Sequence, residues 1–494
     1  MNIKIESGSI ISADADLIVV NLFEDVTEPK GATGIVDDAL KGIISEFVIK
    51  KENFKGKFAS MYVLSTPANS FSKVLIVGLG KADKFDLNKI RVLSSKVIQK
   101  CKTLGNVKKI ASIIHGAGIG GFDAKDCAQA IVEGTLIGNY SFDKYKSEKD
   151  DDSKIEEFKL IEIDKTNFEK AEEGVIKGQI VANAVNFARN LANEPAMEMT
   201  PAKLAEYAQS VKNVETVVFD KEQIEAEGMR AFLAVGQGSS EPPKFIHMKY
   251  VPQSPKKKIV LIGKGITFDS GGLDLKPPSS MVTMKDDMSA AAAVISIMNV
   301  LADLKIDIEV HGLIAACENM PSGSSYKPGD VLISKSGKTI EVDNTDAEGR
   351  ITLADVLTYA QELKPDEIID IATLTGACLV ALGYVASGIM GNNQELIDKL
   401  IKSGTKGGER LWQLPLFEEY KDALKSDIAD MKNTGSRYGG ASMAGLFLKN
   451  FVSDNIPWAH IDIAGTAMLD KSIGELPKGP SGVCVRTVLN YFLS

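Results

Sequence analysis

The heptapeptide NTDAEGR (residues 344–350) lies between an apolar-alternating run at 339–342 and a helix-like run at 353–363, which indicates a strand-to-helix junction. Strand-like and helical runs also alternate through the rest of the chain after about residue 194. Their apolar continuity indicates strands that are buried on both faces, as in a largely parallel sheet covered by helices. The best strand candidates are residues 258–262, 308–315 and 368–373.

The N-terminal third of the chain, from residue 3 to about residue 142, has a similar alternation of short strand-like runs and helical runs. This pattern predicts a separate α/β layer. A helical spacing of Ala, Val, Ile and Phe over 168–191 then predicts a helix that links the two parts. The strand candidates of the N-terminal part are residues 17–22, 61–65, 74–77 and 109–114.

The charged side chains of the heptapeptide are the first sign of a functional site. In an extended segment Asp346, Glu348 and Arg350 would point to one side, because side chains alternate with period two. Gly349 is expected to bend the chain between them. Two acids and a guanidinium aimed at one spot indicate a binding or catalytic centre, whereas the alternative is a surface turn whose charges pair with one another.

Composition limits the classes of function. At 494 residues the chain exceeds a single core, so two or more domains are expected, and 44% hydrophobic and 25% charged residues are typical of a soluble globular protein. A net charge of −9 argues against a general basic surface for nucleic acid, although not against a local patch. We expect no signal peptide and no membrane span. Five scattered cysteines without a CxxC pair indicate reduced thiols in a cytoplasmic protein.

The stretch HGAGIGG (residues 115–121) contains a GxGxxG match at Gly116, Gly118 and Gly121. It is either a dinucleotide-binding loop or a glycine-rich turn between a strand and a helix. A dinucleotide loop requires an acid that closes the next strand about 20 residues further on. The sequence at that distance is polar and charged, which favours the turn.

A second charged cluster follows the predicted strand 258–262. The segment GKGITFDSGGLDLK (263–276) brings Lys264 and Asp269 to a loop at the carboxyl end of that strand, where open α/β sheets bind ligands. Asp286 and Asp287 precede an alanine-rich helix predicted over 289–301. Aspartate is a preferred N-cap residue, so we expect one of these two acids to cap the helix and the other to be free as a ligand. The four histidines have no zinc-pair spacing, so any metal must be held mainly by oxygen.

These residues resemble a known family. KGITFDSGG (264–272), Lys276, Asp287 and the heptapeptide are similar to the leucyl aminopeptidases of family M17 (cytosol aminopeptidase, PepA-like). The resemblance implies an α/β fold with two domains, a smaller N-terminal α/β domain and a larger C-terminal catalytic domain with a central mixed, mostly parallel sheet covered by helices. The implied bounds are 1–165 for a macro-like N-terminal domain, 166–193 for a linking helix and 194–494 for the peptidase domain. Weaker matches at 193–195, 439–441 and 458–465 extend the similarity over about residues 170–485.

The resemblance also implies the cofactors and partners. Two divalent metal ions, Mn or Zn with Mg and Co as further candidates, and a bicarbonate ion bound at Arg350 are expected in each subunit of a cytoplasmic homohexamer. Lys276 and Arg350 match the catalytic pair of the family. One metal site would use Asp269, Asp346 (with its backbone carbonyl) and Glu348, and the other would use Lys264, Asp269, Asp287 and Glu348.

The implied activity is removal of the N-terminal amino acid, preferably leucine or another apolar residue, from peptides. The substrate's free amine would bind one metal, Lys276 and a metal would polarise the carbonyl, and a metal-bridging hydroxide would attack it while bicarbonate serves as the base. Met284, Thr373, Gly376 and Ala464 would lie near the substrate side chain, with Ala467 or Met468 in the pocket wall. For Ala464 and Met468 a role in the core is an equal alternative.

The charges of the cluster agree with hydrolysis of a peptide bond. Four carboxylates formally neutralise two divalent ions and leave Lys276 and Arg350 to face the oxyanion of a tetrahedral intermediate. Lys264 can bind a metal only as a neutral amine, and nearby dications and burial would lower its pKa; without a metal it could form a salt bridge with Asp269. The rival interpretations are a nucleic-acid-binding scaffold, which would show salt-dependent DNA binding, and a two-metal phosphoesterase, which needs no lysine ligand.

Overall fold

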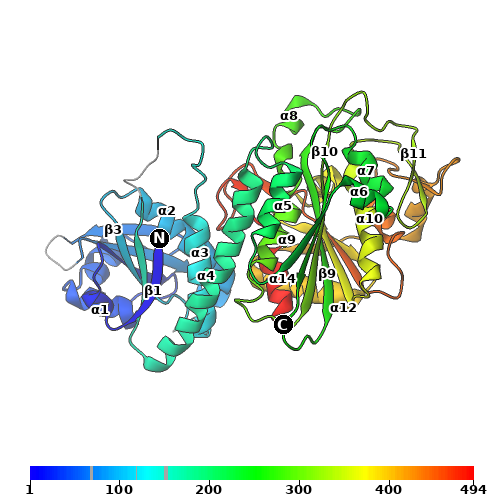
Figure 1. The fold of residues 1–494 in the computed structure, drawn as a ribbon. Coiled ribbons are helices and arrows are strands. Elements are labelled where there is room, and N and C mark those ends of the chain that lie inside the picture. Colours follow the sequence, from blue (N-terminus) through cyan, green and yellow to red (C-terminus); the bar gives the residue numbers. More distant parts are fainter. Residues whose placement is uncertain (67–70, 118–119, 149–153) are drawn as a thin grey trace. The chain divides into compact units, whose positions relative to one another are not determined.

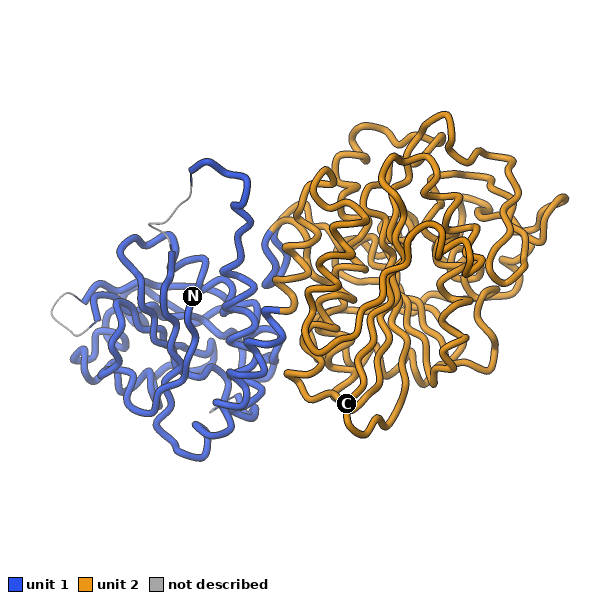
Figure 2. Tube along the Cα trace, in the orientation of Figure 1, with its two compact units in different colours: residues 1–183, 472–477 blue, residues 184–471, 478–494 orange. Residues whose placement is uncertain are grey.

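The computed structural model describes residues 1–66, 71–117, 120–148 and 154–494. Within them the chain forms two compact units (Figure 2). Unit 1 comprises Met1–Asn183 and Ser472–Pro477, and unit 2 comprises Ala184–Lys471 and Lys478–Ser494. The single long helix α4 (Lys165–Asn193) contains the last residues of the first stretch of unit 1 and the first residues of unit 2.

Unit 1 is built on a six-stranded sheet of order β1-β6-β5-β2-β4-β3 (Figure 1). Neighbouring strands are parallel, except that β3 is antiparallel to β4. The four strands predicted from sequence in this part are all present. The strands are β1 (Asn2–Ser7), β2 (Leu17–Phe23), β3 (Met61–Ser65), β4 (Lys73–Gly80), β5 (Lys109–Ile113) and β6 (Glu157–Glu162).

The helices of unit 1 begin at side-chain caps and pack closely. Asp86 and Asp123 accept hydrogen bonds from the first turns of α2 and α3. A Cβ atom at Gly134 of α3 would lie 2.1 Å from the carbonyl oxygen of Arg91 in α2, so glycine allows the two helices to approach each other. The helices are α1 (Gly31–Ala39), the π-helix η2 (Ile43–Lys51), α2 (Leu87–Lys102) and α3 (Ala124–Gly138), with short 3₁₀ turns η1 (Ile10–Ser12) and η3 (Ala82–Lys84).

Unit 2 is built on an eight-stranded mixed sheet of order β15-β14-β17-β13-β9-β10-β8-β7. Its centre, β17-β13-β9-β10, is parallel, whereas β14, β8 and β7 pair antiparallel with their inner neighbours. The strands are β7 (Glu215–Phe219), β8 (Lys244–Tyr250), β9 (Lys258–Asp269), β10 (Glu309–Asn319), β13 (Glu367–Ala372), β14 (Ser387–Gly391), β15 (Leu411–Gln413) and β17 (Trp458–Asp462).

Helices cover the sheet of unit 2 (Figure 1). The apolar continuity of its strands in the sequence predicted this arrangement. The alanine-rich helix α9 (Ser289–Met298) lies directly on β9, because a Cβ atom at Gly263 would come within 2.8 Å of the carbonyl oxygen of Ala290. The other helices of eight or more residues that lie wholly in unit 2 are α5 (Pro201–Gln209), α10 (Glu348–Glu362), α12 (Gln394–Gly407), α13 (Gly440–Lys449) and α14 (Val485–Phe492).

No helix of the described residues has the length and apolarity needed to cross a membrane.

Shorter elements complete unit 2. The short helices are α6 (Lys221–Ala226), α7 (Arg230–Gly236), α8 (Pro278–Met281), η4 (Met284–Asp286), α11 (Gly376–Leu382) and η5 (Glu418–Leu424). The short strands are β11 (Val331–Ile333), β12 (Thr339–Glu341), β16 (Met431–Lys432), β18 (Met468–Leu469) and β19 (Gly479–Pro480).

Candidate metal centre and active site

Strand β9 carries two of the predicted metal ligands. The sequence placed Lys264 and Asp269 in a loop after a strand ending at 262, but β9 continues to Asp269, so this prediction was wrong. The two residues are five positions apart, and regular alternation would put their side chains on opposite faces of the sheet. The pairing of β9 with β10 skips Thr267, and this extra residue is a β-bulge that returns Asp269 to the side of Lys264.

The heptapeptide is a turn followed by a helix, not an extended segment. Helix α10 begins at Glu348, so Glu348 and Arg350 lie in its first turn and Asp346 lies in the turn before it. The prediction that side chains alternate along an extended segment here was therefore wrong. The three side chains reach the same region because the chain changes direction at the start of the helix.

Gly349 has a different role from the bend that the sequence suggested. It does not adopt a positive φ. A Cβ atom at this position would lie 2.5 Å from Cε and 2.8 Å from Nζ of Lys264. The absence of a side chain at Gly349 thus provides the space that the buried Lys264 ammonium occupies.

Two lysines pair with four carboxylates at this site. Nζ of Lys264 lies 2.8 Å from Asp287 and 2.7 Å from Glu348, and it also donates to the carbonyl oxygen of Thr373. Its pairing with Asp269, the alternative expected from the sequence, is not found.

Nζ of Lys276 lies 2.8 Å from Asp269 Oδ2 and 2.5 Å from Asp346 Oδ1. The Lys264 side chain is 4% exposed, so it is out of water, whereas the Lys276 side chain is 14% exposed and reaches the edge of the cluster.

Burial and mutual repulsion make the three aspartates of the cluster easier to protonate, whereas Glu348 is harder to protonate. Burial, with the neighbouring charge of Glu348, raises the pKa of Asp269 to about 6. Burial also raises the pKa of Asp287 well above its usual range and raises that of Asp346. For Glu348, burial would raise the pKa, but the charges of Lys264 and Lys276 outweigh it and lower the pKa.

The pKa of Lys264 differs from the expectation. Burial lowers it, but Asp287, Glu348 and Asp269 together have the larger effect and raise the pKa above its ordinary value. The expected lowering depends on dications next to the amine. Among the side chains alone, Lys264 is an ammonium ion.

The donor set fits divalent cations. One carboxylate oxygen each from Asp269, Asp346 and Glu348 can be chosen so that all three lie within 4.8 Å of one another. Oδ2 of Asp287 and Oε2 of Glu348 are buried and have no hydrogen-bond partner among the described residues. Buried carboxylate oxygens without a partner are costly, and oxygen-rich clusters of this kind suit Mn, Mg or Zn.

Arg350 is buried next to this cluster. Its Nη1 donates to the carbonyl oxygen of Asn433 at 2.9 Å, whereas its Nε is buried without a partner among the described residues. Burial lowers the pKa of Arg350 to about 10, and Glu348 and Asp462 oppose this shift. The guanidinium is still charged at neutral pH and has a donor available for a small anion.

Neither aspartate of the 286–287 pair caps helix α9. The N-cap residue is Met288, and no side chain caps the helix, so the expectation of one aspartate N-cap was wrong. Asp287 instead accepts hydrogen bonds from Lys264 and from Thr373 Oγ1 at 2.7 Å. Asp286 is buried, and burial raises its pKa to about 7.

The predicted substrate-pocket residues lie in unit 2, after two strands and in short helices. Thr373 follows β13 and contacts the cluster through Asp287 and Lys264. Gly376 is the exposed first residue of α11, and half-buried Ala464 follows β17 and donates to Asp462. Met284 begins the short helix η4 that leads to Asp287. Of the two further wall candidates, Ala467 is buried in the core and Met468 is half-buried in β18.

Two asparagines that hold the site together escaped the sequence prediction. Nδ2 of Asn319, at the end of β10, donates to Asp269 Oδ1 and to the carbonyl oxygen of Thr345. Nδ2 of Asn433 donates to the carbonyl oxygen of Asn344, and its Oδ1 accepts from the backbone N–H of Asp343 and Asn344.

Asp462 was also missed. It lies at the carboxyl end of β17, where it accepts hydrogen bonds from Thr375 and Ala464. For Asn319 and Asp462 the available signal was a buried polar residue at the carboxyl end of an apolar run. For Asn433, far along the chain, we find no such signal.

Comparisons with known proteins identify the family of the chain. The profile of the "Cytosol aminopeptidase family, catalytic domain" matches residues 186–489, and that of the "Cytosol aminopeptidase family, N-terminal domain" matches residues 19–149. The chain is 44% identical to a probable cytosol aminopeptidase of Persephonella marina over all of both chains. It is 47% identical to one of Aquifex aeolicus over 90% of each chain.

Solved structures show the same two-domain architecture. A mutant of tomato leucine aminopeptidase matches with a TM-score of 0.89 and 31% identity, over 100% of this chain and 96% of its own. The bottromycin maturation enzyme BotP in complex with Mn matches with a TM-score of 0.86 and 30% identity, over 97% of this chain and 99% of its own. The chain therefore belongs to the cytosol aminopeptidase family, and it is a metallo-aminopeptidase, a hydrolase that acts on the N-terminal end of peptides.

Proposed function

We propose that this aminopeptidase removes an N-terminal leucine or another apolar residue with the help of two divalent metal ions held in unit 2. The observation that carries this proposal is the convergence of Asp269, Asp346 and Glu348, which offer oxygens within 4.8 Å of one another. Buried carboxylate oxygens without partners at Asp287 and Glu348 support it. BotP, a structural relative, is described in complex with Mn.

We assign Asp269, Asp346 and Glu348 to one metal, and Lys264, Asp269, Asp287 and Glu348 to the other. Lys264 would have to lose its proton to serve as a ligand, and the dications would displace it from its ion pairs with Asp287 and Glu348. When bound, the metal pair would supply Lewis acidity, polarising the scissile carbonyl and bringing the pKa of a water molecule towards neutrality. Mn and Zn are our first candidates, with Mg and Co after them.

Lys276 is the residue that we assign to the developing oxyanion. Its ammonium group reaches Asp269 and Asp346 from the edge of the cluster. Because it is not fully enclosed, it can turn from these carboxylates towards a substrate oxygen, whose negative charge it would stabilise.

Arg350 is the residue that we assign to an anion, and bicarbonate fits its chemistry. Planar guanidinium groups bind planar oxyanions through two parallel hydrogen bonds. One Arg350 nitrogen is committed to Asn433, which fixes the plane of the group, while its buried Nε is available. The bound anion would take a proton during hydrolysis, since no other described side chain of the cluster is free for this task.

The preference for an apolar side chain rests on Met284, Thr373, Gly376 and Ala464. Methionine and alanine walls suit an apolar substrate residue, and glycine leaves space for it. Thr373 connects this region to the cluster through its hydrogen bond to Asp287.

A chelator-stripped sample tests the function. Hydrolysis of a leucyl anilide should disappear on stripping and return when Mn, Zn or Mg is added. The N-acetylated anilide should stay intact, because its blocked nitrogen cannot bind a metal as the free amine does. Failure of all metals to restore hydrolysis, or equal cleavage of both substrates, would remove the proposal. Hydrolysis of phosphate esters instead would favour the phosphoesterase.

We further propose a cytoplasmic homohexamer. All five cysteines are free and buried, which suits a reducing compartment. Light scattering of the purified chain tests the assembly, and a mass below six subunits at micromolar concentration would contradict it.

A further inference from the structure

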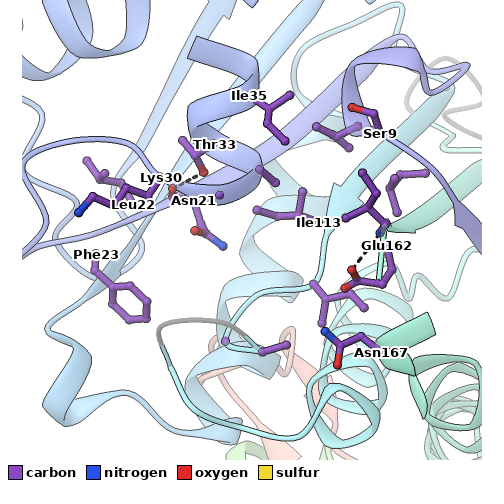
Figure 3. Close-up of a pocket in the computed structure, with 18 of the residues that line it drawn as sticks. Ser9, Asn21, Leu22, Phe23, Lys30, Thr33, Ile35, Ile113, Glu162 and Asn167 are labelled. Carbon is purple, nitrogen blue, oxygen red and sulfur yellow. Dashed lines mark hydrogen bonds between the residues drawn. The ribbon is translucent and has the colours of Figure 1, made fainter. Parts of the chain in front are cut away.

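Unit 1 contains a cavity of about 400 Å³ (Figure 3). Small-molecule pockets have volumes of roughly 300–1,000 Å³, so the cavity can hold a ligand. Its walls come from the carboxyl ends of four parallel strands, β1, β2, β5 and β6, and from the start of helix α1. Every residue that lines it belongs to unit 1, so it is a feature of that unit alone.

The topology of the sheet favours ligand binding at this place. After β2 the chain continues to β3 and β4 on one side of it, whereas after β5 it continues through α3 to β6 on the other side. The connections therefore diverge at the β2–β5 pair. In open α/β sheets, ligands bind outside the carboxyl ends of the strands at such a switch point.

One end of the cavity is suited to an anion. Helix α1 begins at Gly31, its N-cap Lys30 makes no side-chain cap, and both residues line the cavity. The first three backbone N–H groups of a helix have no partner within the helix, and they attract phosphate. The exposed ammonium of Lys30 adds a positive charge at the same end.

Asn21 supplies a polar edge inside the cavity. Ser112 Oγ donates to the carbonyl oxygen of Ile113, so it can accept a hydrogen bond from Nε2 of the buried His115. Burial lowers the pKa of His115 to about 4, so its ring is neutral and Nδ1 accepts from Asn21 Nδ2 at 2.9 Å. This chain of hydrogen bonds fixes the Asn21 amide and leaves its oxygen and second N–H for a ligand.

An acidic residue lies at another edge of the cavity. Strand β6 ends at Glu162, whose Oε1 accepts hydrogen bonds from the backbone N–H groups of Ile163 and Asp164, so that its side chain is held in place (Figure 3). The sequence pattern of a dinucleotide loop required an acid that closes the strand after the glycine loop. Glu162 closes that strand, and it lines the cavity together with Gly116. Gly118 of the motif lies outside the described residues.

The rest of the cavity is apolar. Isoleucine side chains from β5, β6 and α1, among them Ile113, Ile161 and Ile35, form its walls, and Phe23 lies at the end of β2 (Figure 3). Flat aromatic rings pack well between such side chains, whereas a free inorganic anion gains nothing from them.

From these features we propose that the cavity of unit 1 binds a nucleoside phosphate. The phosphate lies at the N-terminus of α1 beside Lys30, and the nucleoside lies between the isoleucine walls with its hydroxyl groups and base edge towards Glu162 and Asn21. This site is additional to the peptidase site of unit 2.

Calorimetric titration of the full-length chain with ADP, adenosine and inorganic phosphate tests the proposal. ADP should bind once per chain, more tightly than either fragment, because only ADP occupies both ends of the cavity. Lys30→Glu should weaken ADP binding about tenfold or more, since it replaces a charged hydrogen-bond donor with a repelling charge. The matched exposed variant Lys51→Glu should bind ADP as the wild type does.

Two further variants separate the cavity from the metal centre. Ser9→Trp should fill the cavity and abolish ADP binding while the thermal midpoint shows that the chain is folded. Glu348→Gln in unit 2 should leave ADP binding intact. Equal binding of ADP and phosphate, no binding of ADP at millimolar concentration, or binding that Glu348→Gln removes and Lys30→Glu leaves unchanged would each overturn the proposal.

Discussion

The carboxyl ends of parallel strands carry the chemistry in both units, but the two places differ in charge. In unit 2, the ends of β9, β10, β13 and β17 present Asp269, Asn319, Thr373 and Asp462. In unit 1, the ends of β2, β5 and β6 surround a mostly apolar cavity with Asn21, Glu162 and Lys30 at its edges. The same topology therefore positions two kinds of site, and the residues at the strand ends decide which ligand is suited to each.

The charge density of the metal centre in unit 2 has a structural cost that the cavity of unit 1 avoids. Buried carboxylates are destabilising unless cations neutralise them, and two lysines supply that charge among the side chains alone. In unit 1 the buried His115 stays neutral, so its hydrogen-bonded chain carries no charge. Four variants can break or sharpen this contrast.

Glu348→Gln should have the largest effect. It removes a carboxylate that we assign to both metals, so leucyl anilide hydrolysis should fall by about a thousandfold or more, and bound metal should fall with it. Glu409→Gln is the matched control, because Glu409 is also buried but pairs with Arg486 and Thr487. The bound metal and the hydrolysis rate should fall together in Glu348→Gln and not in Glu409→Gln. Full metal occupancy with a normal rate in Glu348→Gln would refute the assignment.

Gly349→Ala should come next. The new Cβ atom would displace the Lys264 side chain, and a misplacement of about 1 Å in such a centre can cost roughly a hundredfold in rate. Gly323→Ala, at a glycine where a Cβ atom meets nothing within 4 Å, should keep the wild-type rate. Equal rates for the two variants would show that the close approach to Lys264 has no catalytic importance.

Arg350→Lys should have a smaller effect and should separate chemistry from metal binding. Lysine keeps the charge but loses the planar pair of donors, so turnover should fall roughly tenfold while the metal content is unchanged. Metal content and kcat are the measurements. Loss of both in parallel would mean that Arg350 supports the metal cluster and not an anion.

The smallest effect concerns the stability of unit 1. Burial lowers the pKa of His115 in the folded chain to about 4, below its unfolded value of 6.5, so its neutral form stabilises the fold fully above pH 6.5. This contribution should decrease as the pH falls from 6.5 towards 4, and the stability lost by pH 5 should be roughly 2 kcal/mol. Urea denaturation at pH 7 and pH 5 should show a smaller difference for His115→Gln than for the wild type, and identical differences would contradict this account.

Four strands of unit 1 (β2, β3, β4 and β5) and three of unit 2 (β9, β10 and β13) could be predicted because their apolar runs are continuous. The extension of β9 through Lys264 to Asp269 could not, because glycine, lysine and threonine in this segment have the composition of a loop, and the bulge at Thr267 depends on pairing with β10. The start of α10 at Glu348 was missed since the charged heptapeptide has no apolar period. In unit 1, helix α3 and the segment after it lengthen the stretch of sequence between Gly116 and Glu162. Glu162 therefore lies well beyond the distance of about 20 residues at which a dinucleotide loop is expected to have its acid.

The functional side chains were easier to predict than their supports. Lys264, Asp269, Lys276, Asp287 and the acids of the heptapeptide have residue types that indicate a metal centre, and the structure brings them together. Asn319 and Asn433 act through hydrogen bonds to backbone groups far away in sequence, which no local pattern records.

The central claim is that the paired lysines and carboxylates of unit 2 hold two metal ions. Anomalous scattering from crystals of the chain grown with Mn²⁺ tests it most directly. The account predicts two peaks, one in contact with Asp269, Asp346 and Glu348 and the other with Lys264, Asp269, Asp287 and Glu348. Peaks elsewhere in a catalytically active crystal, with Lys264 still paired to Asp287 and Glu348, would contradict it.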